Sequence, residues 1–155
     1  MGSVRVTERF LHSDPPTGEE LDAAAHAVRE LLPELQPAEA IGVAGTITSI
    51  AALELGDYDP ERIDGYRLSR AAVEAQLERL ASLPLAQRRG LPGLELERAP
   101  VIVAGAVIVR EVLDRYGLDG LEASERDILH GAALEAAALP PAEEGDAPPG
   151  AYTCC

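Results

Sequence analysis

The sequence contains no lysine, asparagine or tryptophan, and only 3% of its 155 residues are aromatic. Without lysine, neither a Schiff base nor a lysine-dependent phosphate loop can form. Because lysine and asparagine both use A-rich codons, their absence is typical of a bacterial genome with high GC content. With so few aromatic residues, the core must consist of Leu, Val, Ile and Ala.

Cysteine and long apolar runs are nearly absent too. The only cysteines, Cys154 and Cys155, are adjacent, which is too few for a zinc site and poorly placed for a disulfide. No apolar stretch is long enough to cross a bilayer, and no basic segment followed by an apolar one marks a signal peptide. We therefore expect a cytoplasmic protein.

Positive charge is also scarce. Thirteen arginines face 27 acidic residues, giving a formal net charge of −14. This balance argues against nucleic acid or an anionic membrane as partner. An anionic small molecule remains compatible with it, because a local group of donors acts over a few ångströms.

The apolar pattern predicts an α/β protein with few strands and about five helices in residues 1–139. Residues 140–155, rich in Pro, Gly and acidic residues, are expected to form a disordered tail. Residues 3–10 alternate like a strand, residues 40–45 read as a strand buried on both faces, and 65–68 and 118–124 are candidate short strands. Five helices are expected. The first follows the Thr17–Glu20 capping box and ends near Pro37, the second covers 46–55, and the third runs from the Ser69 cap through 81. The fourth covers 100–116, with Pro100 in its first turn, and the fifth covers 125–139.

The turn between the strand at 40–45 and the following helix is the main candidate for chemistry. Gly42 and Gly45 bracket the turn, and Thr46 begins the helix. Unpaired amides at a helix N-terminus attract anions, and Thr46 and Thr48 would add hydroxyl donors. From the motif alone we favour a structural interpretation, in which the glycines only allow close packing and Thr46 only caps the helix.

Arginine supplies the remaining candidates. Arg5 and Arg9 share one face of the expected first strand, where guanidinium groups suit phosphate. A solvated face explains Arg5 equally well and is the favoured interpretation for Arg9. Arg88 and Arg89 read as ordinary solvated charge. Arg98 opens a helix, where a cation is unfavourable, which hints at a specific partner or a surface carboxylate. We predict no catalytic triad and no metal ligand.

Four segments, VRVTERFLHSDPPT, GVAGTITSIAAL, RAPVIVAGAVIVREVLDRYG and SERDILHGA, occur in an order that resembles the exopolyphosphatase and guanosine pentaphosphate phosphatase (Ppx/GppA) family over residues 2 to about 135. The resemblance implies the ribonuclease H-like fold of actin, sugar kinases and Hsp70, in which two α/β domains flank a cleft for a phosphate chain and a divalent cation. Only the second, C-terminal domain is matched, with the glycine turn as its adenosine-side motif and residues 2–10 as a middle strand of its sheet.

The family's other signatures have no counterpart here. Its Asp-x-Gly-Ser-Asn and Asp-x-Gly-Gly-Gly-Ser-x-Glu loops, and the two glutamates assigned to catalysis, are absent, and Pro100 stands where relatives often carry an acidic residue. We therefore expect no activity from this chain alone. Joined to the missing N-terminal half, it would hydrolyse terminal phosphate from polyphosphate or guanosine pentaphosphate (pppGpp) with Mg²⁺. The phosphate contacts would come from Gly45, Thr46 and Arg5, supported by Gly42 and Thr48.

A second hypothesis comes from another class of protein. The chain could be a non-catalytic phosphate-binding or assembly module that dimerises, or docks on a partner, through an exposed sheet edge.

Overall fold

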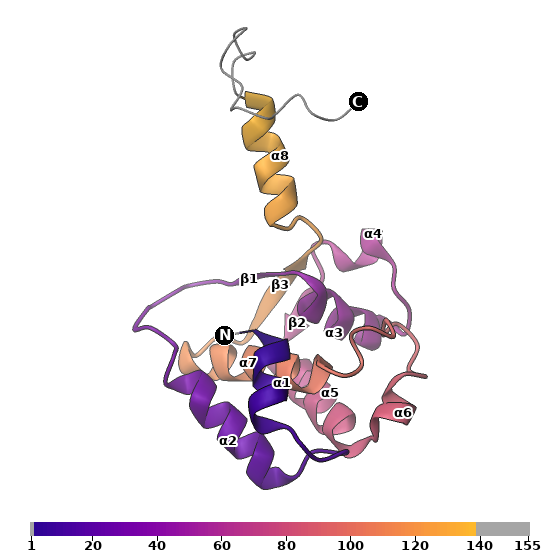
Figure 1. The fold of residues 1–155 in the computed structure, drawn as a ribbon. Coiled ribbons are helices and arrows are strands. Elements are labelled where there is room, and N and C mark those ends of the chain that lie inside the picture. Colours follow the sequence, from indigo (N-terminus) through magenta and orange to yellow (C-terminus); the bar gives the residue numbers. More distant parts are fainter. Residues whose placement is uncertain (1, 139–155) are drawn as a thin grey trace, which may run out of the picture.

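The computed structural model describes residues 2–138, which form eight helices and a three-stranded sheet (Figure 1). The strand order is β1 (Ile41–Val43), β3 (Gly120–Ser124), β2 (Arg67–Ser69). β1 runs parallel to β3, with Gly42 opposite Ala123, whereas β2 is antiparallel to it. The expected α/β class with few strands is therefore confirmed; the tail predicted at 140–155 lies outside the described residues.

Helix α7 (Ile102–Arg115) lies at the centre of the helices. It packs against α1 (Ser3–Phe10), α2 (Gly18–Arg29), α3 (Gly45–Leu55) and α5 (Arg70–Ser82). The fully buried side chains are aliphatic, as the composition requires, and include Ile50, Val73, Leu80, Ile102 and Val107. The short helices α4 (Pro60–Ile63) and α6 (Leu85–Arg88) lie in connections, and α8 (Ile128–Ala138) points away from the rest (Figure 1). No described helix is both long and apolar enough to cross a membrane.

The predicted helix starts agree with the structure where capping chemistry fixes them. The Thr17 hydroxyl accepts from the Glu20 amide at 3.2 Å, and the Glu20 carboxylate accepts from the Thr17 amide at 2.9 Å. Ser69 caps α5 in the same way through the amide of Ala72. The ends are less accurate: α2 stops at Arg29 rather than near residue 37, and Pro100 precedes α7 instead of lying in its first turn.

The strand predicted at residues 3–10 is wrong, because these residues form α1. Val4 and Val6, which alternation places together, separate: Val6 is fully buried, whereas Val4 is 53% exposed. The residues therefore cannot supply a middle strand of the sheet. Arg5 and Arg9, one helical turn apart, lie on the same side of α1 and are exposed.

The expectation that residues 40–45 are buried on both faces is also wrong. β1 lies at the edge of the described sheet, and Ile41 and Val43 are 70% and 44% exposed. Apolar composition indicates burial only where a neighbouring element covers the strand, and no described element lies along the outer edge of β1. The exposed sheet edge that the sequence led us to expect is therefore that of β1, not of residues 3–10.

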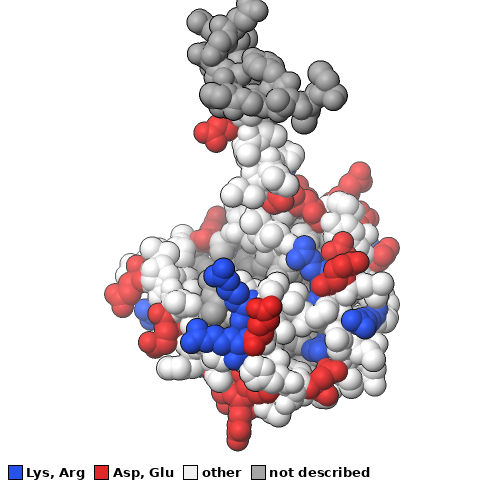
Figure 2. All heavy atoms as spheres, viewed as in Figure 1, with Lys and Arg blue, Asp and Glu red and all other residues white. Residues whose placement is uncertain are grey.

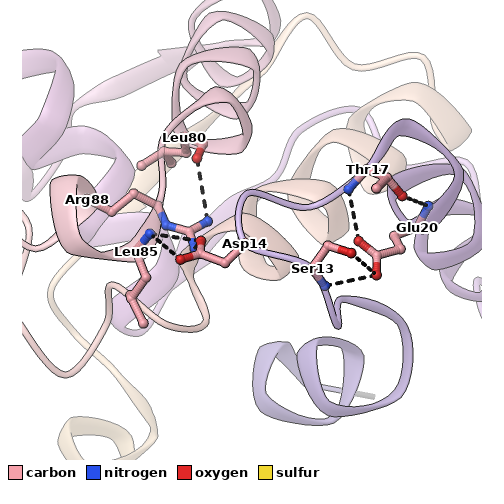
Figure 3. Close-up of polar contacts among 7 residues, drawn as sticks. All are labelled: Ser13, Asp14, Thr17, Glu20, Leu80, Leu85 and Arg88. Atoms are coloured by element: carbon pink, nitrogen blue, oxygen red, sulfur yellow. Dashed lines mark hydrogen bonds and ion pairs between the residues drawn. The ribbon is translucent and has the colours of Figure 1, made fainter.

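Arg88, which we expected to be solvated, is buried. Its guanidinium donates to Asp14 at 3.0 Å and to the Leu80 carbonyl at 3.5 Å, while Asp14 also accepts from the Leu85 amide (Figure 3). Burial lowers the pKa of Arg88, and the Asp14 carboxylate opposes that shift. The pair ties the loop before α2 to α6, a contact between residues 74 positions apart that no local pattern signals.

Candidate functional site

The turn from β1 into α3 has the geometry expected of an anion-binding helix start. The carbonyl of Ala44, the N-cap, accepts from the amides of Ile47 and Thr48, so the amides of Gly45 and Thr46 precede the first intrahelical bond. No side chain caps the helix. Ala44 has φ 69° and ψ 169°, and it is the one non-glycine with positive φ among residues 2–138. Such a conformation costs roughly 1–3 kcal/mol and tends to occur at functional sites.

The glycines around this turn are explained by close contacts. A Cβ on Gly42 would lie 2.8 Å from Ile47 Cγ1, so Gly42 lets β1 pack against α3. A Cβ on Gly45 would lie 2.2 Å from Arg98 Cζ, so Gly45 makes room for a guanidinium. The packing interpretation therefore accounts for Gly42, whereas Gly45 serves to bring a cation to the helix start.

Arg98 lies in the turn before α7, not in the helix that we expected it to open. Its guanidinium rests over Gly45 and pairs loosely with Glu95, at 3.6 Å, while 43% of the side chain stays exposed. The cation thus reaches the N-terminus of α3 from another part of the chain. An N-terminus with positive partial charge and an adjacent arginine attract the same negatively charged ligands.

Two hollows meet at Gly45 and Arg98. The larger, of about 450 Å³, lies between the start of α1, the exposed edge of β1, α3 and α7, and its walls include Ser3, Ile41 and Thr46. Among the described residues that line it, Arg98 is the one with a charged side chain. In a chain of net charge −14, a hollow lined by arginine and no carboxylate favours an anion.

The smaller hollow, of about 180 Å³, has the opposite character. Besides Thr48 and Arg98 it is lined by Glu95, Glu125 and Asp127. Thr48, with only 7% of its surface exposed, lines this hollow and not the larger one. The two sides of α3 therefore differ: the hollow on the Thr46 side has no carboxylate in its lining, whereas the hollow on the Thr48 side has three.

Acidic groups near the end of β3 are held by hydrogen bonds. Asp64 accepts from the Glu125 amide at 3.1 Å and from the Ser124 hydroxyl at 2.9 Å, and these bonds lower the pKa of Asp64. Tyr58 donates to Glu125, and partial burial together with that carboxylate raises the pKa of Tyr58. No group of three His, Cys, Asp or Glu residues in the described part of the chain is arranged to hold a metal ion.

The structure places three of the five predicted phosphate ligands in one hollow. Gly42, Gly45 and Thr46 line the larger hollow and Thr48 lies on the other side of the same turn. Arg5 lies elsewhere: with Glu8, Arg9 and Leu31 it lines a separate, open hollow. Figure 2 shows basic side chains, with acidic ones beside them, gathered over α1 in the middle of the face in view.

The sequence did not predict which group the side chain of Arg98 contacts. The one signal was its unfavourable place near a helix start, which left open whether a carboxylate or a ligand was its partner. In the structure its guanidinium lies beside Gly45, at the start of α3, and pairs with Glu95.

Comparison with known proteins identifies the family of this chain. Residues 1–138 match the model of the Ppx/GppA phosphatase family. The chain is 41% identical over 150 residues to exopolyphosphatase 2 of Mycobacterium tuberculosis, covering 88% of this chain and 47% of that protein. It is 32% identical over 145 residues to a bifunctional 3-dehydroquinate synthase/phosphatase of Fusobacterium nucleatum, covering 87% and 22%.

Solved structures give the same result. The Ppx/GppA enzyme of Aquifex aeolicus superposes with a TM-score of 0.83 at 29% identity, over 87% of this chain and 47% of that one. An exopolyphosphatase-like protein superposes with a TM-score of 0.81 at 33% identity, over 88% and 48%. The chain thus spans about half the length of these relatives, as expected for part of an actin-like, two-domain fold. The match over residues 1–138, the identity to curated relatives and the agreement in fold lead to one conclusion: the chain belongs to the Ppx/GppA phosphatase family.

Proposed function

We propose that this chain is the C-terminal, phosphate-binding half of an exopolyphosphatase, which releases terminal phosphate from polyphosphate or pppGpp when joined to an N-terminal half. The observation that carries the proposal is the start of α3, uncapped and overlaid by Arg98, at the edge of a hollow without carboxylates. Phosphate is the natural ligand of such a site. The relative with 41% identity is named an exopolyphosphatase, which favours polyphosphate as the substrate.

Each candidate residue has its own proposed role in binding phosphate. The amides of Gly45 and Thr46 and the Thr46 hydroxyl donate to phosphate oxygens in the larger hollow, and Arg98 adds a charge-assisted bond. Gly42 supports them through packing, and Thr48 faces the smaller hollow. Arg5 is too far along α1 to share this subsite, so it meets only the more distant groups of a long phosphate chain.

This half does not carry out the hydrolytic step. Attack by water requires a general base, and the family's glutamate-bearing loops are absent from the sequence. Mg²⁺ is usually held by one or two carboxylates together with the substrate's phosphates, and we route no step of this proposal through the ion. Its own contribution is to bind and orient the phosphate chain.

Binding of tripolyphosphate to the whole chain, measured by calorimetry, tests the site. Arg98→Gln removes the cation and Gly45→Ala displaces it, so each should weaken binding about tenfold or more. The matched controls are Arg79→Gln, on the exposed surface of α5, and Gly18→Ala, where an added Cβ meets nothing within 4 Å. Equal losses in the controls, or unchanged affinity in both site variants, would refute the assignment.

Phosphate release tests the activity. A chimera joins the part of M. tuberculosis exopolyphosphatase 2 outside the match, which we propose to be its N-terminal part, to this entire chain. With polyphosphate and Mg²⁺, the chimera should release phosphate and this chain alone should not. Release by the chain alone would show that catalytic residues lie within it; no release from a folded chimera that still binds tripolyphosphate would contradict the proposed activity.

A further inference from the structure

Arg98 is shared by two hollows of opposite character. Its side chain lines both the larger hollow, which has no carboxylate in its lining, and the smaller one, which has three. Among residues 2–138 the guanidinium has one acidic partner, Glu95, and the contact is made by Nε. The two terminal nitrogens of Arg98 have no hydrogen-bond partner within this part of the chain, so they remain available to a ligand.

Glu95 is the acid of the smaller hollow that is not engaged elsewhere by the described residues. The Glu125 carboxylate accepts from the Tyr58 hydroxyl at 3.0 Å. The Asp127 carboxylate accepts from two backbone amides at the start of α8, at 2.9 and 3.3 Å. Glu95 contacts Arg98 instead, with 3.6 Å between Oε2 and Nε. The carboxylate that competes with a ligand for Arg98 is therefore that of Glu95.

A tight turn keeps Glu95 and Arg98 together. The Glu95 carbonyl accepts from the amides of Arg98 and Ala99 at 3.0 and 3.3 Å, so the segment turns as a helix does and residues three apart lie on one side. Leu94 and Ala99 are buried, which fixes the turn to the core, whereas the side chains of Glu95 and Arg98 are 57% and 43% exposed. The backbone therefore brings the two charges together before any ligand binds.

The ion pair between Glu95 and Arg98 is weak. Its 3.6 Å separation exceeds the length of about 2.8 Å that is usual for a charge-assisted hydrogen bond, and water screens both exposed side chains. A phosphate group carries more negative charge and presents several oxygens. At the start of α3 it would also meet the amides of Gly45 and Thr46, so it would hold the guanidinium more strongly than a single carboxylate does.

We propose that Glu95 is an internal rival of the phosphate ligand for Arg98 and thereby sets the affinity of the phosphate site. In the free chain, the Glu95 carboxylate holds the guanidinium beside the smaller hollow. A phosphate in the larger hollow replaces that carboxylate as the partner of the guanidinium. Glu95 acts through Arg98 and is a positioning residue, not a catalytic one. The inference rests on the proposed function for the identity of the ligand.

Calorimetry with tripolyphosphate and the whole chain tests the effect on affinity. Glu95→Gln should strengthen binding about two- to fivefold, which is the usual strength of an exposed ion pair expressed as a change in affinity. The matched control is Glu97→Gln, which removes the same charge from an exposed residue of the same turn that lines neither hollow, and it should leave the affinity unchanged. In the Arg98→Gln background, Glu95→Gln should have no effect, because the group for which it competes is gone.

The NMR resonance of the Arg98 Nε–H group gives a second readout, which a purely structural role of Glu95 would not produce. In the free chain, Glu95→Gln should shift this resonance, because the carboxylate beside Nε is lost. In chain saturated with tripolyphosphate, the wild type and Glu95→Gln should give the same resonance position, because phosphate has already replaced the carboxylate.

Each other outcome overturns the inference. Weaker or unchanged binding by Glu95→Gln would show that Glu95 supports Arg98 or does not act on it. An equal gain in Glu97→Gln, or in the Arg98→Gln background, would reduce the effect to a general effect of charge. Resonances that still differ at saturation would show that Glu95 and phosphate hold the guanidinium together.

The same measurements separate the inference from the proposed function. If the wild type does not bind tripolyphosphate, the proposed phosphate site fails and the rival fails with it. If the wild type binds, Arg98→Gln weakens binding and Glu95→Gln brings no gain, the proposed function stands and the rival alone is refuted.

Discussion

The contact between Gly105 of α7 and Thr46 of α3 determines where the proposed phosphate site lies. A Cβ on Gly105 would lie 2.6 Å from Thr46 Cγ2 and 2.7 Å from Thr46 Oγ1. In an unobstructed helix interior, glycine to alanine would stabilise the protein by about 1 kcal/mol. Overpacking a core contact costs about 1–3 kcal/mol, so Gly105→Ala should be neutral to destabilising by about 2 kcal/mol. Thr46→Ala removes both obstructing atoms, so the double variant should recover the helix gain.

Urea unfolding of the wild type, both single variants and the double variant gives the coupling energy directly. We expect Gly105→Ala to be about 1–3 kcal/mol more favourable when residue 46 is alanine than when it is threonine. A coupling below about 0.5 kcal/mol would mean that Thr46 does not pack on Gly105, and the reasoning that places the first turn of α3 against α7 would fail. Gly18→Ala, where the added Cβ meets nothing, should show no coupling to Thr46→Ala.

Two further predictions concern the loop before α2 (Figure 3). Asp14→Asn leaves the buried guanidinium of Arg88 without its carboxylate. Because Asp14 is itself half exposed, we expect the free energy of unfolding to fall by about 1–3 kcal/mol, which a lower Tm would show. The control Asp22→Asn, on the exposed surface of α2, should leave Tm unchanged. The pKa of Glu20 is lowered from 4.5, chiefly by the Thr17 amide, so its stabilising contribution is present above that value and is lost as the pH falls through the folded-state pKa. Urea midpoints at pH 6 and pH 3 should therefore differ more in the wild type than in Glu20→Gln, and equal differences would contradict this account.

The parts of the fold that the sequence predicts are those fixed by neighbouring residues. Thr17 with Glu20, and Ser69 with the amide of Ala72, each bond within one helical turn, so the residue types alone locate the starts of α2 and α5. The start of α3 is likewise located by the residue types next to it. Its glycines and threonines predict a tight turn followed by a helix N-terminus, and the structure has that N-terminus without a side-chain cap; that it binds an anion stays a prediction.

The failures occur where a distant contact decides. The segment containing Val4, Val6 and Phe10 fits alternation, yet Val6 and Phe10 are also one helical turn apart, and contact with α7 selects the helix. Likewise, nothing around Arg88 indicates that Asp14 lies against it. The contact of Arg98 could not be predicted for the same reason: only the folded chain shows that its guanidinium lies beside Gly45.

The exposed edge of β1 and the phosphate site are parts of one surface. Ile41 and Val43 are exposed at that edge and also line the larger hollow, together with Arg98 and Thr46. A strand paired to β1 would cover the free backbone edge of β1, and its own side chains would lie beside Ile41 and Val43 and partly screen the hollow from water. Removing water lowers the local dielectric, which strengthens the attraction between Arg98 and a phosphate oxygen. Under the proposed function, the apolar edge of β1 and the uncapped start of α3 would act together, since a second half paired along β1 would also screen the proposed phosphate site from water.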